Sequence, residues 1–126
     1  MARKAIYKQG NAGIVTVTAA ALGDLCHTLS LRRSAIITKI LAYNVTGGPV
    51  TLQFGTHDRL TPTFVPLLPL LVCVNGVDNE WNETDLPPVE FVSWPQLTAA
   101  GRTGDIYVVS SGAGPTVIIE VKEIGG

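Results

Sequence analysis

A chain of 126 residues has room for one domain, and its 46% hydrophobic and 15% charged side chains are the reverse of the balance found in disordered proteins. Nine Lys and Arg against ten Asp and Glu give a net charge of −1, which argues against nucleic-acid binding as the main task, because such binding relies on clustered basic residues. We expect a single domain over residues 1–126, with residues 1–10 as an N-terminal arm.

Thirteen glycines and eight prolines divide the chain into short segments rich in Val, Ile and Thr, a pattern typical of strands joined by turns. Only residues 18–25 suggest a helical turn, which Gly23 ends. The sequence predicts an all-β sandwich or barrel of about eight strands. In chain order these strands are residues 13–19, 25–31, 35–45, 50–55, 70–74, 89–94, 105–110 and 116–124.

Two turns are expected to join paired neighbouring strands. Residues 46–49, Thr-Gly-Gly-Pro, separate two β-branched segments, and the glycines supply the backbone angles that tight hairpins need. Residues 111–115 separate the last two strands in the same way. By contrast, Pro62, Pro66 and Pro69 remove backbone donors, so residues 56–69 are expected to be an irregular connection or an edge strand.

No motif for catalysis or for a cofactor is evident. The two histidines, His27 and His57, accompany no Gly-x-Ser-x-Gly elbow, and Cys26 and Cys73 form no metal-binding spacing. We therefore predict a protein that is not an enzyme, with no cofactor and no metal. Buried free thiols are expected for the cysteines, although a disulfide between them stays open. A carboxylate pair among Glu80, Glu83, Asp85 and Glu90 is the remaining route to an enzyme.

Residues 78–85 form an acidic loop that is the best candidate for ligand binding. Carboxylate and amide oxygens suit calcium, and an exposed Trp81 would suit a sugar ring. The plainer interpretation is a solvated loop, with Trp81 and Trp94 used in packing. The possible ligand residues are Asp78, Glu80, Trp81, Glu83 and Asp85. The sequons at Asn44 and Asn82 are interpreted as turn residues, because no secretory signal precedes them.

Residues 37–56, with their β-branched strand, Gly-Gly-Pro turn and returning strand, resemble the strand–turn–strand units of small jelly-roll structural proteins. Virion-associated, phage decoration and tumour-necrosis-factor-like trimeric domains are examples. The resemblance implies a jelly-roll-like sandwich that forms a trimer, with apolar strand faces meeting around the three-fold axis.

We therefore expect a structural or assembly protein whose main partner is a second copy of itself, with other virion or assembly proteins as further partners. The low share of charge supports this, because apolar surface usually marks association sites. The predicted contact is centred on residues 64–74, a segment too short and too rich in proline to span a membrane as a helix. A soluble protein, of the virion or the cytoplasm, is expected. The predicted interface residues are Phe64, Val65, Leu67, Leu68, Leu70, Tyr43, Phe91 and Tyr107.

Overall fold

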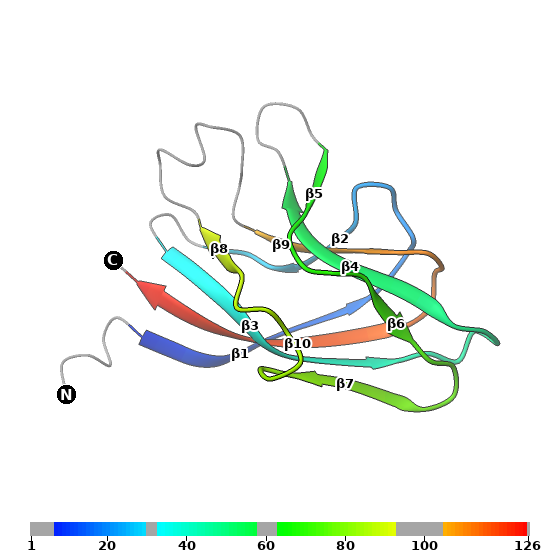
Figure 1. The fold of residues 1–126 in the computed structure, drawn as a ribbon. Helices are drawn as coiled ribbons and strands as arrows, with labels where there is room; N and C mark the ends of the chain where they lie inside the picture. Colours follow the sequence, from blue (N-terminus) through cyan, green and yellow to red (C-terminus); the bar gives the residue numbers. More distant parts are fainter. Residues whose placement is uncertain (1–6, 30–32, 58–62, 93–104, 126) are drawn as a thin grey trace.

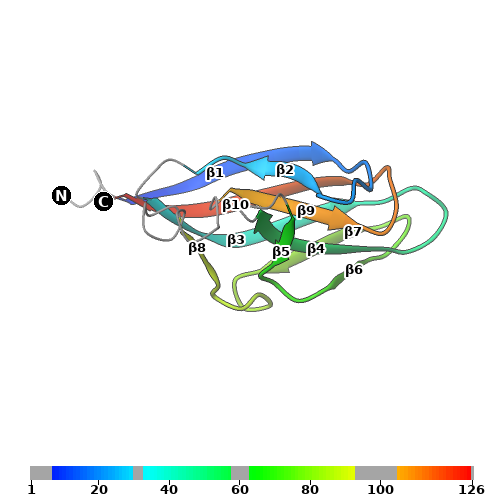
Figure 2. The same ribbon diagram turned by 90° about the horizontal axis from the view of Figure 1, so that it is seen from above.

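The structure, a computed structural model, describes residues 7–29, 33–57, 63–92 and 105–125, which form ten β-strands. These build two five-stranded antiparallel sheets that face each other as a sandwich (Figures 1 and 2). No helix in the described part of the chain has the length and apolar character needed to cross a membrane. The strands are β1 (Tyr7–Thr16), β2 (Asp24–His27), β3 (Arg33–Tyr43), β4 (Val50–His57), β5 (Phe64–Pro66), β6 (Leu71–Cys73), β7 (Asp78–Asn82), β8 (Glu90–Val92), β9 (Ile106–Ser110) and β10 (Thr116–Gly125).

The strand order is that of a jelly roll. Sheet A has the order β1-β10-β3-β7, and sheet B has the order β2-β9-β4-β5. Strands from the two ends of the chain therefore pair with each other, and the first four strands alternate between the sheets. β8 also pairs with β3, and β6 also pairs with β4, so the ten strands fill eight positions. The predicted all-β, jelly-roll-like sandwich of about eight strands is confirmed.

Neither of the two predicted hairpins forms. The turn at residues 46–49 joins β3 of sheet A to β4 of sheet B, and the turn at residues 111–115 joins β9 of sheet B to β10 of sheet A. The turn residues reverse the chain in both cases, but the two strands that each turn joins belong to different sheets and do not pair with each other. The prediction of paired neighbours was wrong because an arch between sheets and a hairpin within one sheet use the same turn residues.

Several predicted boundaries also differ from the structure. β1 begins at Tyr7, because its pairing with β10 extends to Tyr7 opposite Ile124, so residues 7–10 are strand rather than arm. β5 is an edge strand, the second of the two alternatives expected for residues 56–69, whereas β7 is a regular strand where an acidic loop was expected. Each pairs with only one other strand, so prolines and charges are tolerated there. Parts of the expected elements, residues 1–6, 30–32, 58–62 and 93–104, lie outside the described residues.

The core lies between the sheets and is filled by alternate residues of the central strands. Among the residues that the structure describes, Phe54 of β4 and Phe91 of β8 are the largest fully buried side chains. Along β3 the buried face changes from Ile37 to Ile40, which breaks strict alternation. A register shift opposite β10 explains this, since Thr38 is an additional residue whose hydroxyl donates to the Glu120 carbonyl at 3.2 Å. The bulge keeps both halves of this long strand facing the core.

Candidate interaction surface

Charged residues are distributed very unevenly between the two sheets. The strands of sheet B contain one charged residue, Asp24, whose carboxylate accepts hydrogen bonds from the Thr18 amide at 2.9 Å and the Thr18 hydroxyl at 2.8 Å. The strands of sheet A contain nine, namely Lys8, Arg33, Lys39, Asp78, Glu80, Glu90, Glu120, Lys122 and Glu123. Most charged residues of the strands therefore lie in sheet A, and sheet B is nearly free of charge.

The side of the sandwich formed by β6 and its neighbouring turns exposes a row of aliphatic side chains. Leu71 and Cys73 point into the core, so the alternate residues Leu70, Val72 and Val74 point outward and are 57%, 53% and 50% exposed. Two further side chains from the adjacent turns, Val77 and Val45, are 51% and 65% exposed. We call the five residues Val45, Leu70, Val72, Val74 and Val77 the apolar edge.

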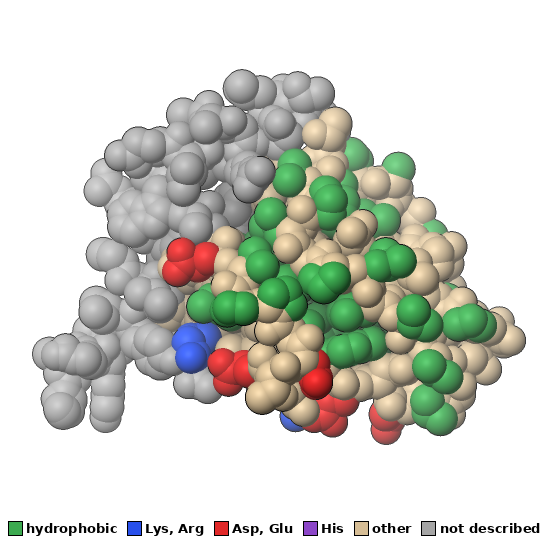
Figure 3. All heavy atoms as spheres, in the orientation of Figure 1, with side chains coloured by type: hydrophobic (Ala, Val, Ile, Leu, Met, Phe, Trp, Pro, Cys, Tyr) green, Lys and Arg blue, Asp and Glu red, His purple; other side chains and the backbone are tan. Residues whose placement is uncertain are grey.

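Figure 3 shows this side of the molecule, with many hydrophobic side chains over β5 and β6 and the charged side chains on the left and along the lower margin. Two prolines next to the apolar edge, Pro66 of β5 and Pro69 beside Leu70, are also exposed. A contiguous neutral surface of this kind is unusual for a small monomer and is typical of a surface that another molecule covers.

Asn79 holds β6 and β7 together beneath the apolar edge. Its side-chain oxygen accepts from the Val74 amide at 2.9 Å, and its Nδ2 donates to the Val74 carbonyl at 3.0 Å and the Val77 carbonyl at 3.1 Å. The side chain thus bonds both backbone groups of Val74, as a neighbouring strand would.

Asn44 fixes the crossing from sheet A to sheet B and is fully buried. Its Nδ2 donates to the Gly48 carbonyl at 2.7 Å and the Cys73 carbonyl at 3.3 Å, and its Oδ1 accepts from the Thr46 amide at 3.0 Å and hydroxyl at 2.7 Å. Its own carbonyl accepts from the Gly76 amide at 2.7 Å. These bonds join the β3–β4 turn to the β6–β7 turn, which places Val45 beside the rest of the apolar edge.

The structure separates the predicted interface residues into four groups, of which the two tyrosines are the last. Leu68 and Phe91, only 4% and 1% exposed, belong to the core of the subunit, so they are unavailable to a second copy and the prediction was wrong for them. Leu70 is exposed on the apolar edge. Phe64, Val65 and Leu67 are partly exposed on or beside β5.

Neither of the two predicted tyrosines is part of the apolar edge. Tyr43 is 46% exposed on β3 of sheet A. Tyr107 lies on β9 of sheet B, where its ring stacks on His57 with centroids 3.6 Å apart. Sequence reasoning missed Val45 and Val77, and it did not single out Val72 and Val74. Side chains alternate between the two faces of a strand, so once residues 70–74 are known to form an edge strand, Val72 and Val74 are expected to point outward.

The predicted ligand loop is a strand followed by a turn. Trp81 lies opposite Ile40 and is partly buried against the core, while binding of a sugar or calcium by this segment stays a prediction. Glu80 pairs with Lys39 at 3.4 Å and Glu83 with Lys122 at 3.9 Å. Asp85 accepts from the Asn82 amide at 2.9 Å within the turn. No group of three or more potential metal ligands occurs among the residues that the structure describes.

Both cysteines are buried and free, so the alternative of a disulfide between Cys26 and Cys73 is excluded. Burial, and secondarily the negative charge of Asp24, raises the pKa of the Cys26 thiol to about 12. Burial also raises the pKa of Cys73. A thiol with a raised pKa stays protonated at neutral pH and is a poor nucleophile.

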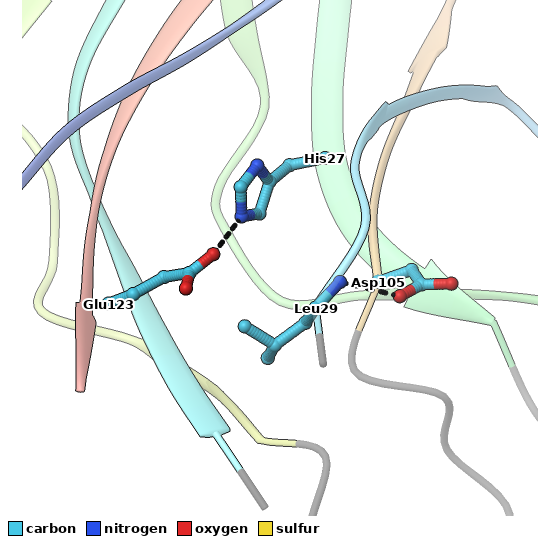
Figure 4. Close-up of polar contacts among 4 residues, drawn as sticks. All are labelled: His27, Leu29, Asp105 and Glu123. Atoms are coloured by element: carbon cyan, nitrogen blue, oxygen red, sulfur yellow. Dashed lines mark hydrogen bonds and ion pairs between the residues drawn. The ribbon is translucent and has the colours of Figure 1, made fainter. Parts of the chain in front are cut away.

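A histidine–carboxylate pair joins the two sheets at the end of the sandwich opposite the apolar edge. Nε2 of His27, on β2, contacts Oε2 of Glu123, on β10, and both side chains are largely buried (Figure 4). Next to it, the Leu29 amide donates to Asp105 Oδ1 at 2.9 Å. The buried carboxylate of Glu123, in sheet A, therefore has the His27 side chain of sheet B as its partner, and a buried carboxylate needs such a partner.

No protein-family model matches the chain, and no curated protein matches it in sequence. Among solved structures, the chain is similar to one described as "Bacillus endospore appendages form a novel family of disulfide-linked pili", with 15% identity over 95% of this chain and 88% of that chain and a TM-score of 0.47. It is also similar to the CBM22-1 xylan-binding domain of Paenibacillus barcinonensis Xyn10C, with 10% identity over 95% and 86% of the two chains and a TM-score of 0.48.

A further similar structure is that of Maize Chlorotic Mottle Virus, with 11% identity over 96% of this chain and 94% of that chain and a TM-score of 0.37. At such identities the similarity is limited to the general fold. The assignment to the jelly-roll class rests on the strand order of the two sheets, which agrees with the resemblance predicted from residues 37–56.

Proposed function

We propose that this protein is a non-enzymatic structural subunit that associates with copies of itself through the apolar edge. The observation that supports the proposal is the row of half-exposed aliphatic side chains on and around β6. A trimer is the favoured symmetry, and a virion-associated or decoration protein is the favoured biological role. Other virion or assembly proteins are the further partners.

The energetics favour an interface larger than the apolar edge alone. Fully burying an aliphatic side chain contributes roughly 1.5–3 kcal/mol, so covering a half-exposed one contributes about 1 kcal/mol. The five side chains of one copy would then contribute about 5 kcal/mol, near the lower end of the roughly 4–15 kcal/mol that association costs. The partly exposed Phe64, Val65 and Leu67, on the same side of the sandwich, would extend the contact.

A closed ring suits this surface better than an open chain of subunits. An exposed edge strand invites pairing with other chains, and β6 lies at the edge of sheet B. In a closed ring every subunit has its edge covered, and growth stops at a fixed number of copies. This is the physical reason for proposing a small closed oligomer.

The test is the native mass by light scattering after size exclusion, measured across a range of protein concentrations. We expect a stable multiple of the 13.3 kDa subunit, and three subunits for the favoured trimer. Val72→Asp places a charge in the middle of the apolar edge and should give single subunits. Ile14→Asp is the matched control, because Ile14 is 70% exposed on β1, an edge strand of sheet A, and is not part of the apolar edge. This variant should keep the native mass of the wild type. A wild-type protein that stays at 13.3 kDa at all concentrations would overturn the proposal.

A further inference from the structure

The outer face of sheet A, which points away from sheet B, carries a half-open pocket of about 270 Å³. It lies over the three neighbouring strands β10, β3 and β7. The strand register sets its main lining residues in two adjacent rows, the first formed by Thr116, Tyr43 and Asp78 and the second by Ile118, Leu41 and Glu80. The pocket therefore combines an aromatic ring, two aliphatic side chains and two carboxylates.

The two carboxylates are accessible to a ligand. Asp78 is exposed directly across from Tyr43, and its side chain makes no hydrogen bond or ion pair with any other residue that the structure describes. Glu80 pairs with Lys39 at 3.4 Å, but the two side chains are 47% and 35% exposed, and ion pairs this exposed are weak. A stronger cationic ligand can displace the Lys39 ammonium.

Hydrogen-bond acceptors dominate this pocket. The amide group of Asn79, which also lines it, is already used in bonds to the backbone of Val74 and Val77. The remaining side-chain donors are the hydroxyls of Tyr43 and Thr116. A ligand that matches such a lining brings N–H donors and a positive charge and needs few donors in return.

We propose that this pocket binds an arginine side chain from a partner protein. A guanidinium group has five N–H donors and no acceptor, and its flat face stacks on aromatic rings. It would lie against the Tyr43 ring and donate to Asp78, with its aliphatic stem along Leu41 and Ile118. This contact uses the outer face of sheet A, whereas the apolar edge is centred on β6 of sheet B.

The test is an NMR titration of the ¹⁵N-labelled protein with Nα-acetyl-arginine amide. Nα-acetyl-citrulline amide is the matched probe, because its side chain has nearly the same shape without the charge. Maltose serves as the neutral sugar. We expect saturable shifts confined to residues 41–43, 78–80 and 116–118 with the arginine probe, and at least about tenfold weaker binding of the citrulline probe.

Variants assign the contacts within the pocket. Asp78→Asn should weaken arginine binding about tenfold, and Tyr43→Leu about fivefold. Glu90→Gln removes an exposed carboxylate from β8 of the same sheet, outside the pocket, and should leave the affinity unchanged. Equal binding of the two probes, an equal loss in Glu90→Gln, the absence of saturable shifts, or maltose binding tighter than arginine would each overturn the proposal. The comparison of probes uses the wild-type protein, so it decides the question even if a variant fails to fold.

Discussion

The buried side chain of Asn44 should be a main determinant of stability, because it joins the two turns beneath the apolar edge. Asn44→Ala removes two donated and two accepted hydrogen bonds. The Cys73 carbonyl loses the Asn44 donor, whereas the Gly48 carbonyl keeps the Thr46 hydroxyl as a donor at 3.3 Å. Each net hydrogen bond contributes about 1 kcal/mol, and part of the loss is recovered where water reaches the exposed turn. We therefore expect the free energy of unfolding to fall by about 2–4 kcal/mol.

Urea denaturation followed by circular dichroism measures this change, provided that the slope with denaturant is unchanged. Asn82→Ala is the matched control, because Asn82 is the other sequon asparagine and its side chain is exposed at the end of β7. It should change the free energy of unfolding by less than about 0.5 kcal/mol. A loss below about 1 kcal/mol in Asn44→Ala, or an equal loss in both variants, would refute the reasoning that the buried asparagine holds this end of the sandwich.

Two further predictions concern the packing of the sandwich. In Gly55→Ala the new Cβ would clash with the Val65 carbonyl oxygen, so β5 must move. The free energy of unfolding should fall by about 3 kcal/mol or more in the same urea assay. Gly48→Ala meets no atom within 4 Å and should cost under about 1 kcal/mol; equal costs would contradict the close approach of β4 and β5. The thiol pKa raised to about 12 predicts that Cys26 resists iodoacetamide in the native protein at about pH 8 and reacts once the protein is unfolded. Because this pKa is higher in the folded state than its ordinary value of 9.0, the contribution of the thiol to the free energy of unfolding is fully present below pH 9.0 and is lost as the pH rises toward about 12. Labelling is measured by mass spectrometry of digested peptides, and rapid labelling of Cys26 in the native protein would contradict its burial.

The self-association and arginine-binding proposals assign different tasks to different parts of one small subunit. The apolar edge and sheet B have almost no charge, whereas the outer face of sheet A has exposed carboxylates around Tyr43. Burial of apolar area gives strength to the contact between copies, while charge complementarity mainly gives specificity to the contact with another protein. Self-association should therefore persist at high salt, and arginine binding should weaken.

The sequence by itself determined the fold class. Alternating β-branched segments between glycines and prolines are enough to predict strands, because a half-buried strand needs one apolar face and the turns need flexible or fixed backbone angles. The shortage of charge also predicted neutral surface somewhere on the molecule.

Only the tertiary structure decided which strands pair and which apolar residues stay outside. Residues 46–49 reverse the chain whether the next strand joins the same sheet or the facing one, and the choice depends on partners far away in sequence, such as β10 for β3 and β9 for β4. The same distant partners bury Leu68 and Phe91 and leave Val72 and Val74 exposed, although all four are equally apolar in the sequence. Burial is a property of the assembled sandwich, so an apolar residue in a single strand does not reveal whether the core or a partner will cover it.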